Sequence, residues 1–186
     1  TIPYKRLVME YCDEIDPRAA AIGAVNTVVN RGGRLYGSNT DYDGFAHLCK
    51  SHGVDFAGRT VLILGTGGTR NTAAAVARDA GAARVLTASR RPDPARGWIS
   101  YEEAAGSGAQ IVVNTTPAGM YPDVGECLLD VAAMPGLEAV VDVVYNPVRT
   151  ELLLRAEEAW VPVTACGLEM LVAQAVWPAE AFLDKP

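Results

Sequence analysis

A glycine-rich turn is the first pattern in this sequence that could do chemistry. It consists of Gly65-Thr66-Gly67-Gly68-Thr69-Arg70 and lies between a short apolar run, 61–64, and an alanine-rich stretch. Glycines let the backbone come close to a pyrophosphate, and free N–H groups at a helix start supply donors and a partial positive charge. This order is typical of dinucleotide binding, with an ordinary strand-to-helix turn as the alternative. Arg70 stands where that pattern usually has Gly or Ala.

A second cluster, Ser89-Arg90-Arg91, follows the next apolar run. A site specific for NAD usually has an acidic residue here, which accepts hydrogen bonds from the ribose 2′-hydroxyl. Arginine instead suits a 2′-phosphate, because its planar guanidinium pairs with phosphate oxygens through two parallel bonds. The sequence therefore favours NADP over NAD. Asp93 lies close enough to keep NAD as an alternative, and an exposed basic turn is another.

Candidate acid–base groups are few, because His47 and His52 are the only histidines. Their spacing does not put them on one helical face, and the four cysteines form no Cys-x-x-Cys pair. We therefore expect no metal site, and reduced, buried thiols. The amine of Lys5 could donate a proton to a carbonyl oxygen and take it back in the reverse direction. Asp41 could orient that amine or could cap a helix.

Several other polar residues are candidate ligand contacts. Asn26 lies in an apolar strand context, where a buried amide needs partners, whereas Asn39 is expected to serve a turn. Tyr145 follows an apolar run, at the kind of strand end where open parallel sheets bind ligands. Gln174 lies on the last helical stretch, with a surface position as the alternative. Residues without a stacking pattern, which we assign to packing, are Trp98, Trp160 and Trp177.

Helical and strand patterns alternate along the chain. Helices are expected near 5–12, 17–22, 41–52, 69–80, 150–159 and 166–183. Strands are expected at 25–30, 34–37, 60–64, 84–87, 111–114 and 139–142. Continuously apolar strands between helices indicate an α/β fold with a doubly wound parallel sheet covered on both faces. Pro178 should break or kink the last helix near Gln174, whose carbonyl its ring would meet.

Composition narrows the function classes. The chain has 186 residues, 49% of them hydrophobic, which is enough apolar material for a sizeable core. Its net charge of −6 argues against a nucleic-acid partner. The sequence has no apolar run long enough to span a membrane and does not open on a targeting segment, so we expect a cytoplasmic protein that acts on a small molecule.

Seven motifs together resemble the shikimate dehydrogenase family. They run from Thr1 to about Phe182 in the family's order and with similar spacings. The motifs are Thr1-Ile-Pro-Tyr-Lys5, Gly23-Ala-Val-Asn26-Thr27, Asn39-Thr40-Asp41, Gly65-Thr-Gly-Gly68, Asn114-Thr-Thr-Pro-Ala-Gly-Met120, Asp142-Val-Val-Tyr145-Asn-Pro147 and Gly167-Leu-Glu-Met-Leu-Val-Ala-Gln174. The resemblance implies an NADP-dependent oxidoreductase that interconverts 3-dehydroshikimate and shikimate, on the shikimate pathway to chorismate and the aromatic amino acids.

The resemblance also implies a site, residue by residue. Lys5 and Asp41 match the family's catalytic pair and also contact substrate. Further residues that match substrate-binding positions are Thr1, Asn26, Tyr145 and Gln174. Residues that match the NADP site are Gly65, Thr66, Gly67, Gly68 and Thr69 in the phosphate turn, Ser89 and Arg90 at the adenosine phosphate, and Val143 and Gly167 at the nicotinamide end. Arg91 is expected to join the cofactor site beside Arg90. Arg91 replaces a smaller polar residue of the family.

By the same resemblance, residues 1–56 belong to a substrate-binding domain, 57–164 form a Rossmann-like NADP domain, and 165–186 form a helix that returns to the substrate domain. Family members begin with a strand and a loop whose two serines hold the substrate carboxylate, so about 60 residues are expected before Thr1. Two alternatives stay open: an enzyme that also takes quinate or prefers NAD, and a non-catalytic nucleotide-binding fragment. A homodimer is also open.

Overall fold

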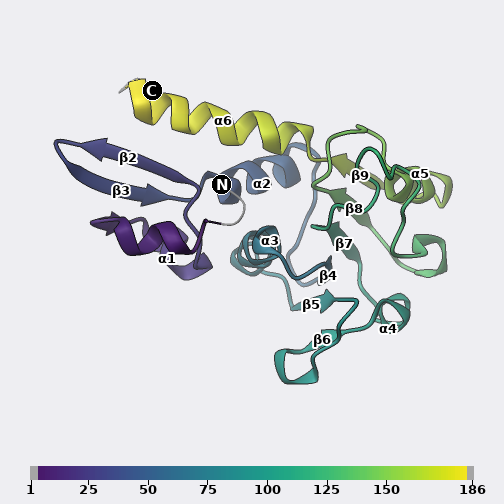
Figure 1. Cartoon of the computed structure of the whole chain (residues 1–186). Helices are drawn as coiled ribbons and strands as arrows, with labels where there is room; N and C mark the ends of the chain where they lie inside the picture. Colours follow the sequence, from purple (N-terminus) through teal and green to yellow (C-terminus); the bar gives the residue numbers. More distant parts are fainter. Residues whose placement is uncertain (1–3, 184–186) are drawn as a thin grey trace.

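Two β-sheets organise residues 4–183, the part of the chain that the structure, a computed structural model, describes (Figure 1). The larger sheet has the strand order β6-β5-β4-β7-β8-β9, and all of its neighbouring strands are parallel. Its strands are β4 (Thr60–Leu64), β5 (Arg84–Ala88), β6 (Trp98–Ile99), β7 (Ile111–Asn114), β8 (Ala139–Asp142) and β9 (Val163–Cys166). The order reverses between β4 and β7, and open parallel sheets bind ligands at such a point.

The two faces of the larger sheet bury separate apolar cores. In β4, Val61 and Ile63 lie in one core and Leu62 and Leu64 in the other, because successive side chains point to opposite faces. The first core is covered by α2 (Thr40–Ser51) and α3 (Gly68–Asp79). The second is covered by α4 (Tyr101–Ala105), the 3₁₀ helix η3 (Val131–Ala133) and α5 (Glu151–Glu158). This coverage of both faces confirms the predicted doubly wound α/β fold.

The smaller sheet has the order β1-β3-β2. Its strands are β1 (Glu14–Ile15), β2 (Thr27–Arg31) and β3 (Arg34–Ser38). β2 and β3, the strands expected near 25–30 and 34–37, form a hairpin whose turn uses Gly32 and Gly33 at positive φ. The Asp16 side chain caps α1 (Pro17–Ile22).

The helix expected at 5–12 is shorter in the structure. Only the 3₁₀ helix η1 (Leu7–Tyr11) forms there, and none of its side chains is buried. A short helix without tertiary packing gains little stability, which explains why the segment does not extend. A further 3₁₀ helix, η2 (Pro94–Arg96), precedes β6.

The last helix, α6 (Leu168–Leu183), runs from the end of β9 back along α2 toward the smaller sheet (Figure 1). Gly44 of α2 allows this close contact, because a Cβ built there would lie 3.0 Å from the carbonyl oxygen of Met170. The predicted break near Gln174 is wrong, since the helix continues through Pro178. Packing along α2 stabilises the helix at this position and outweighs the hydrogen bond that proline cannot donate.

The helix α2 contributes to the core of the larger sheet. Its Phe45, Leu48 and Cys49 are buried with Val61 and Ile63 of β4. Its first turn, by contrast, begins directly after β3 of the smaller sheet. Because α2 thus adjoins both sheets, the predicted domain boundary near residue 56 stays a prediction.

Cysteines and metal ligands are dispersed through residues 4–183. Within this range Cys12, Cys49, Cys127 and Cys166 are free. In the same residues no three His, Cys, Asp or Glu side chains converge as metal ligands would. None of the helices described is both long and apolar enough to cross a bilayer. Burial raises the pKa of Cys49, so this side chain is a neutral thiol in the core.

Candidate active site

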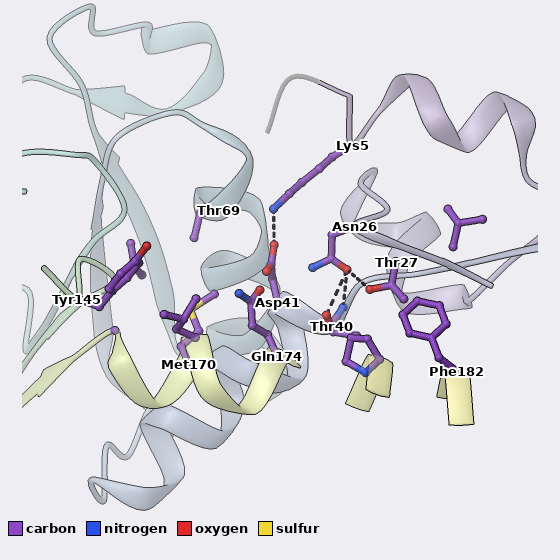
Figure 2. A pocket seen from close by; sticks show the side chains of 15 residues that line it. Lys5, Asn26, Thr27, Thr40, Asp41, Thr69, Tyr145, Met170, Gln174 and Phe182 are labelled. Atoms are coloured by element: carbon purple, nitrogen blue, oxygen red, sulfur yellow. Dashed lines mark hydrogen bonds and ion pairs between the residues drawn. The ribbon is translucent and has the colours of Figure 1, made fainter. Parts of the chain in front are cut away.

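A cavity of about 710 Å³ opens between the smaller sheet, α2, α6 and the ends of β8 and β9 (Figure 2). We call it the first cavity. The predicted site residues that line it are Lys5, Asn26, Asp41, Thr69, Val143, Tyr145, Gly167 and Gln174. These residues come from segments up to 169 positions apart in the chain, so the fold brings the predicted substrate and nicotinamide positions together. Thr1 lies outside the described residues.

An ion pair lies at the wall of the first cavity. The Lys5 Nζ donates a hydrogen bond to Asp41 Oδ2, and the two side chains are 16% and 8% exposed (Figure 2). Asp41 is fixed at the start of α2, where its backbone N–H donates to the Asn39 side chain, the predicted turn residue. The carbonyl oxygen of Lys5 accepts a hydrogen bond from the Val25 N–H, which fixes the other partner. Such a largely buried, positioned ammonium group can donate a proton to a bound oxygen.

The amide of Asn26 has one possible orientation. Its Oδ1 accepts hydrogen bonds from the backbone N–H of Thr40, the Thr40 hydroxyl and the Thr27 hydroxyl. Because a backbone N–H can only donate, the atom that faces it must be the oxygen. The Asn26 nitrogen then points toward the side of the cavity where Asp41 and Gln174 lie (Figure 2). Asn26 is therefore placed to donate to a ligand oxygen.

Two further walls of the first cavity come from the larger sheet and α6. Tyr145 follows the end of β8 and is 45% exposed, whereas Gln174 lies on the face of α6 that packs against Gly44. Apolar contacts come from Met170, which is 8% exposed. The cavity residues that sequence reasoning missed are Thr27, Val28, Thr40, Met170, Leu171, Pro178 and Phe182. The helical spacing of Met170 and Gln174 could have indicated the α6 side of this wall.

The glycine turn joins β4 to α3, as predicted. Gly65 has φ +98°, and a Cβ built there would lie 2.6 Å from Thr116 Cγ2, so this position requires glycine. At Gly67 and Gly68, by contrast, no described atom outside the adjoining residues and the backbone of α3 comes within 4 Å of a built Cβ. These two glycines open the start of α3 to an approaching group. A phosphate fits there, because the N–H groups of a helix start attract negative charge.

A second cavity, of about 400 Å³, lies on the other side of the turn. It brings Gly65, Thr66 and Gly67 together with Ser89, Arg90 and Arg91, as the sequence predicted. Thr69 instead lines the first cavity, so the start of α3 lies between the two. Ser89 is buried, and its hydroxyl accepts a hydrogen bond from the Arg91 N–H. Arg90 forms an ion pair with Glu126, with 3.2 Å between Nη2 and Oε1.

Arg70 occupies the position where the dinucleotide pattern usually has a small residue. Its Nε donates to the Thr87 hydroxyl at 3.0 Å, which joins the first turn of α3 to β5. Burial lowers the pKa of Arg70, and the nearby charge of Arg78 lowers it further. The long side chain thus connects helix and strand where a glycine would let them pack directly.

The second cavity also contains residues that sequence reasoning missed. Trp98, assigned to packing, lines it with Tyr101 and the segment 115–117. The packing assignment is wrong for Trp160, which is 90% exposed and has φ 58°. The side chain of Trp177 lies outside the described set. No spacing signal could identify Trp98, because a two-residue strand, β6, carries it to the rim.

A buried network joins the loops that follow β7 and β8. Asp142, which is fully buried, accepts hydrogen bonds from the Asn114 amide, the Val144 N–H and the Thr150 hydroxyl, at 2.9, 3.0 and 2.6 Å. Asn114 in turn accepts from the backbone and hydroxyl of Thr116. Thr116 lines the second cavity and Val143 the first. The network therefore holds the walls of both cavities in one arrangement.

Asp142 is expected to make stability depend on pH. Burial raises the pKa of Asp142 to about 6, although its three hydrogen bonds lower it in part. Between about pH 4 and pH 6 the folded protein keeps a proton that the unfolded chain has lost, so stability falls as pH rises. Asp142→Asn removes this dependence, and the stability difference between variant and wild type should grow by up to about 3 kcal/mol across this range.

Urea unfolding of both proteins at pH 4, 5, 6 and 7 measures this difference. Asp123→Asn, at an exposed carboxylate, is the matched control and should leave the wild-type pH profile unchanged. Parallel profiles for wild type and Asp142→Asn would show that the buried carboxyl does not titrate in this range.

Comparison with known proteins gives the chain's relatives. A family model, the shikimate dehydrogenase substrate binding domain, matches residues 1–28. A shikimate dehydrogenase (NADP(+)) from Symbiobacterium thermophilum is 40% identical over an alignment 194 residues long, and the alignment covers 94% of this chain and 66% of that protein.

Solved structures agree with this result. A chorismate mutase/shikimate 5-dehydrogenase fusion protein from Clostridium acetobutylicum has a TM-score of 0.94 at 35% identity, over 100% of this chain and 69% of that one. Shikimate 5-dehydrogenase from Thermus thermophilus, in complex with NADP(H) and shikimate, has a TM-score of 0.84 at 32% identity, over 97% of this chain and 70% of that one. This chain thus spans about two thirds of the length of these relatives.

Proposed function

Because this chain belongs to the shikimate dehydrogenase family, we propose that it catalyses the reversible, NADP(H)-dependent reduction of 3-dehydroshikimate to shikimate. One observation carries the proposal: the Lys5–Asp41 pair lines the same cavity as Thr69 at the start of α3 and Val143 and Gly167 at the sheet ends. The proposed proton donor and the proposed nicotinamide end of the dinucleotide site thus line one cavity. The reaction belongs to the shikimate pathway, which leads to chorismate and the aromatic amino acids.

The residues of the glycine turn and the second cavity fit NADP. Gly67 and Gly68 leave room at the start of α3 for the pyrophosphate, and Thr66 and Thr69 flank it. Ser89, Arg90 and Arg91 would hold the 2′-phosphate, and Val143 and Gly167 would lie against the nicotinamide end. Bound NADP(H) supplies or accepts the hydride.

Lys5 is proposed to move the proton. In the reduction direction, the substrate carbonyl carbon gains a hydride and the carbonyl oxygen takes a proton from the Lys5 ammonium. The product is the secondary alcohol, and Lys5 is left as a neutral amine that solvent reprotonates. In the reverse direction the amine accepts the hydroxyl proton. Asp41 orients Lys5 and, with its second oxygen, could accept a hydrogen bond from a substrate hydroxyl.

The remaining polar side chains of the first cavity are proposed to orient the substrate ring. Asn26 donates through its nitrogen, because Thr40 and Thr27 occupy its oxygen. Gln174 adds an amide from the α6 wall of the cavity, and Tyr145 adds a phenol from the wall formed by the larger sheet. Several donors and acceptors around one ring suit a polyhydroxylated substrate, since each hydroxyl then finds a partner. For Thr1, the proposed contact with the substrate rests on the family resemblance alone.

The proposed function is tested by following NADPH absorbance when the complete encoded protein is mixed with shikimate and NADP⁺. We expect reduction of NADP⁺ that depends on shikimate and reverses with 3-dehydroshikimate and NADPH. Absence of turnover in both directions, with a folded protein that binds NADP, would favour the non-catalytic alternative. A cytoplasmic location is also proposed, because the four free cysteines suit a reducing compartment. A homodimer stays a proposal that sedimentation equilibrium can test.

Arg90 is expected to decide the preference for NADP over NAD. Arg90→Ala should weaken NADP binding by about 1.5–3 kcal/mol, roughly tenfold to a hundredfold, because a charge-assisted hydrogen bond to the 2′-phosphate is lost. NAD binding should stay nearly unchanged. Calorimetric titration with both dinucleotides measures the effect. Arg84→Ala, at the opposite end of β5, is the matched control, and equal losses for NADP and NAD in Arg90→Ala would remove the 2′-phosphate assignment.

A further inference from the structure

The arginine proposed to bind the 2′-phosphate already has an acidic partner. Glu126 lies in the segment between β7 and η3, and its Oε1 is 3.2 Å from Arg90 Nη2. Arg90 follows the end of β5 and lines the second cavity. The two residues are 36 positions apart, so the fold rather than local sequence pairs them.

We propose that Glu126 is a specificity-determining residue: its carboxylate weakens binding of the NADP 2′-phosphate at Arg90 and so makes the preference for NADP over NAD smaller. This inference rests on the proposed NADP site. A guanidinium has five N–H donors, and the carboxylate of Glu126 engages one of the terminal nitrogens that a phosphate would use. A phosphate seated on Arg90 would also bring like charges close together, which costs free energy.

The charge of Glu126 is not expected to weaken the binding of NAD. Its ribose carries a neutral 2′-hydroxyl, which neither competes strongly for the guanidinium nor repels a carboxylate. The charge on Glu126 therefore affects the two dinucleotides differently. A residue that changes the affinity for one ligand and leaves the other unchanged alters specificity by that difference.

The surroundings of Glu126 hold it near Arg90. Its backbone N–H donates to the Asp123 carbonyl, and its own carbonyl oxygen lies 3.3 Å from a Cβ built on Gly119. Tyr101 of the second cavity lies close to both charges. Burial raises the pKa of Tyr101, the charge of Arg90 lowers it, and that of Glu126 raises it. Glu126 itself lines a neighbouring cavity with residues 122–125, so its carboxylate reaches the second cavity through Arg90, with which it pairs.

The size of the effect follows from exposure. The side chains of Arg90 and Glu126 are 69% and 41% exposed, so water screens their interaction. Exposed ion pairs contribute little, which corresponds to changes in affinity of about twofold to fivefold. Salt should reduce the effect further, because the Debye length falls to about 3 Å at 1 M ionic strength. Glu126 therefore adjusts the preference and does not create it.

Glu126→Gln tests the proposal, because glutamine keeps the shape and removes the charge. Calorimetric titration at low salt should show NADP⁺ binding about twofold to fivefold tighter, with NAD⁺ binding unchanged. Adenosine 2′,5′-bisphosphate should gain as NADP⁺ does, whereas adenosine 5′-monophosphate should not. The gain should shrink in 1 M salt. Glu138→Gln is the matched control, because Glu138 pairs with Arg59 beside the start of β8, whereas Arg90 follows the other end of the parallel strands.

Two results would overturn the proposal. Unchanged NADP⁺ affinity in Glu126→Gln would show that the carboxylate has no influence on the phosphate. Weaker NADP⁺ binding would show the opposite role, in which Glu126 holds Arg90 ready for the phosphate. Arg90→Ala separates these results from failure of the proposed function. If Arg90→Ala selectively weakens NADP⁺ while Glu126→Gln has no effect, the NADP site stands and only the role of Glu126 is lost.

Discussion

Lys5→Met is expected to lower turnover of shikimate by two to four orders of magnitude, with NADP binding unchanged. Removal of a positioned acid or base typically costs a factor of this size. Methionine fills a similar volume and keeps the side chain of Asp41 covered, but it cannot exchange a proton. The cofactor contacts proposed for Arg90 and the glycine turn lie outside this change. Steady-state rates in the complete encoded protein, with calorimetric NADP titration, measure both quantities.

Two further variants sharpen the test of Lys5. Lys5→Arg keeps the positive charge beside Asp41 but cannot release a proton, so it should be nearly as slow as Lys5→Met. Lys50→Met, at an exposed position in the last turn of α2, is the matched control and should leave turnover unchanged. Near-normal turnover in Lys5→Met would show that Lys5 is only a structural partner of Asp41 and that another group transfers the proton.

Strands buried on both faces were the part of the fold that the sequence predicted best. The expected bounds of 60–64, 111–114 and 139–142 match β4, β7 and β8, because central parallel strands need continuous apolar runs. β9 was missed, since Val163–Cys166 mixes polar and apolar residues at the edge of the sheet. β6 was missed because two residues carry no periodic signal.

Local chemistry also predicted part of the candidate site. Asn39 caps α2 as turn chemistry suggested, and the glycine turn begins α3. Contacts between segments far apart in the chain could not be predicted from the sequence. Nothing in the sequence near Arg90 indicates Glu126, and the pairing depends on how the segment after β7 lies against the end of β5. The same holds for Pro178, where packing on α2 decides whether a helix with an internal proline continues.

Gly167 is the position where one methyl group should have the largest structural effect. A Cβ built there would lie 2.0 Å from the Val143 carbonyl oxygen and 2.5 Å from its carbonyl carbon. Both are backbone atoms, so no side-chain rotation can relieve the contact. The Gly167 N–H also donates to the Val144 carbonyl, which holds the start of α6 against the loop after β8. An added methyl must therefore move the loop and helix apart.

Gly167→Ala is expected to lower the free energy of unfolding by about 3 kcal/mol or more, the upper range for overpacking. Where the variant still folds, turnover should fall by about a hundredfold, because Val143 and Gly167 both line the first cavity and small displacements there misplace the reacting groups. Thermal unfolding and steady-state rates measure the two effects.

Gly125→Ala is the matched control for this change. Apart from the two adjoining residues, no described residue has an atom within 4 Å of a Cβ built at Gly125, so the free energy of unfolding should change by no more than about 0.5 kcal/mol. If Gly167→Ala were as stable and as active as this control, the loop after β8 would have to accommodate a methyl group without moving Val143. The close approach of the two backbones would then not be what sets the geometry of the first cavity, and the buried network of Asp142, Asn114 and Thr150 would have to hold it alone.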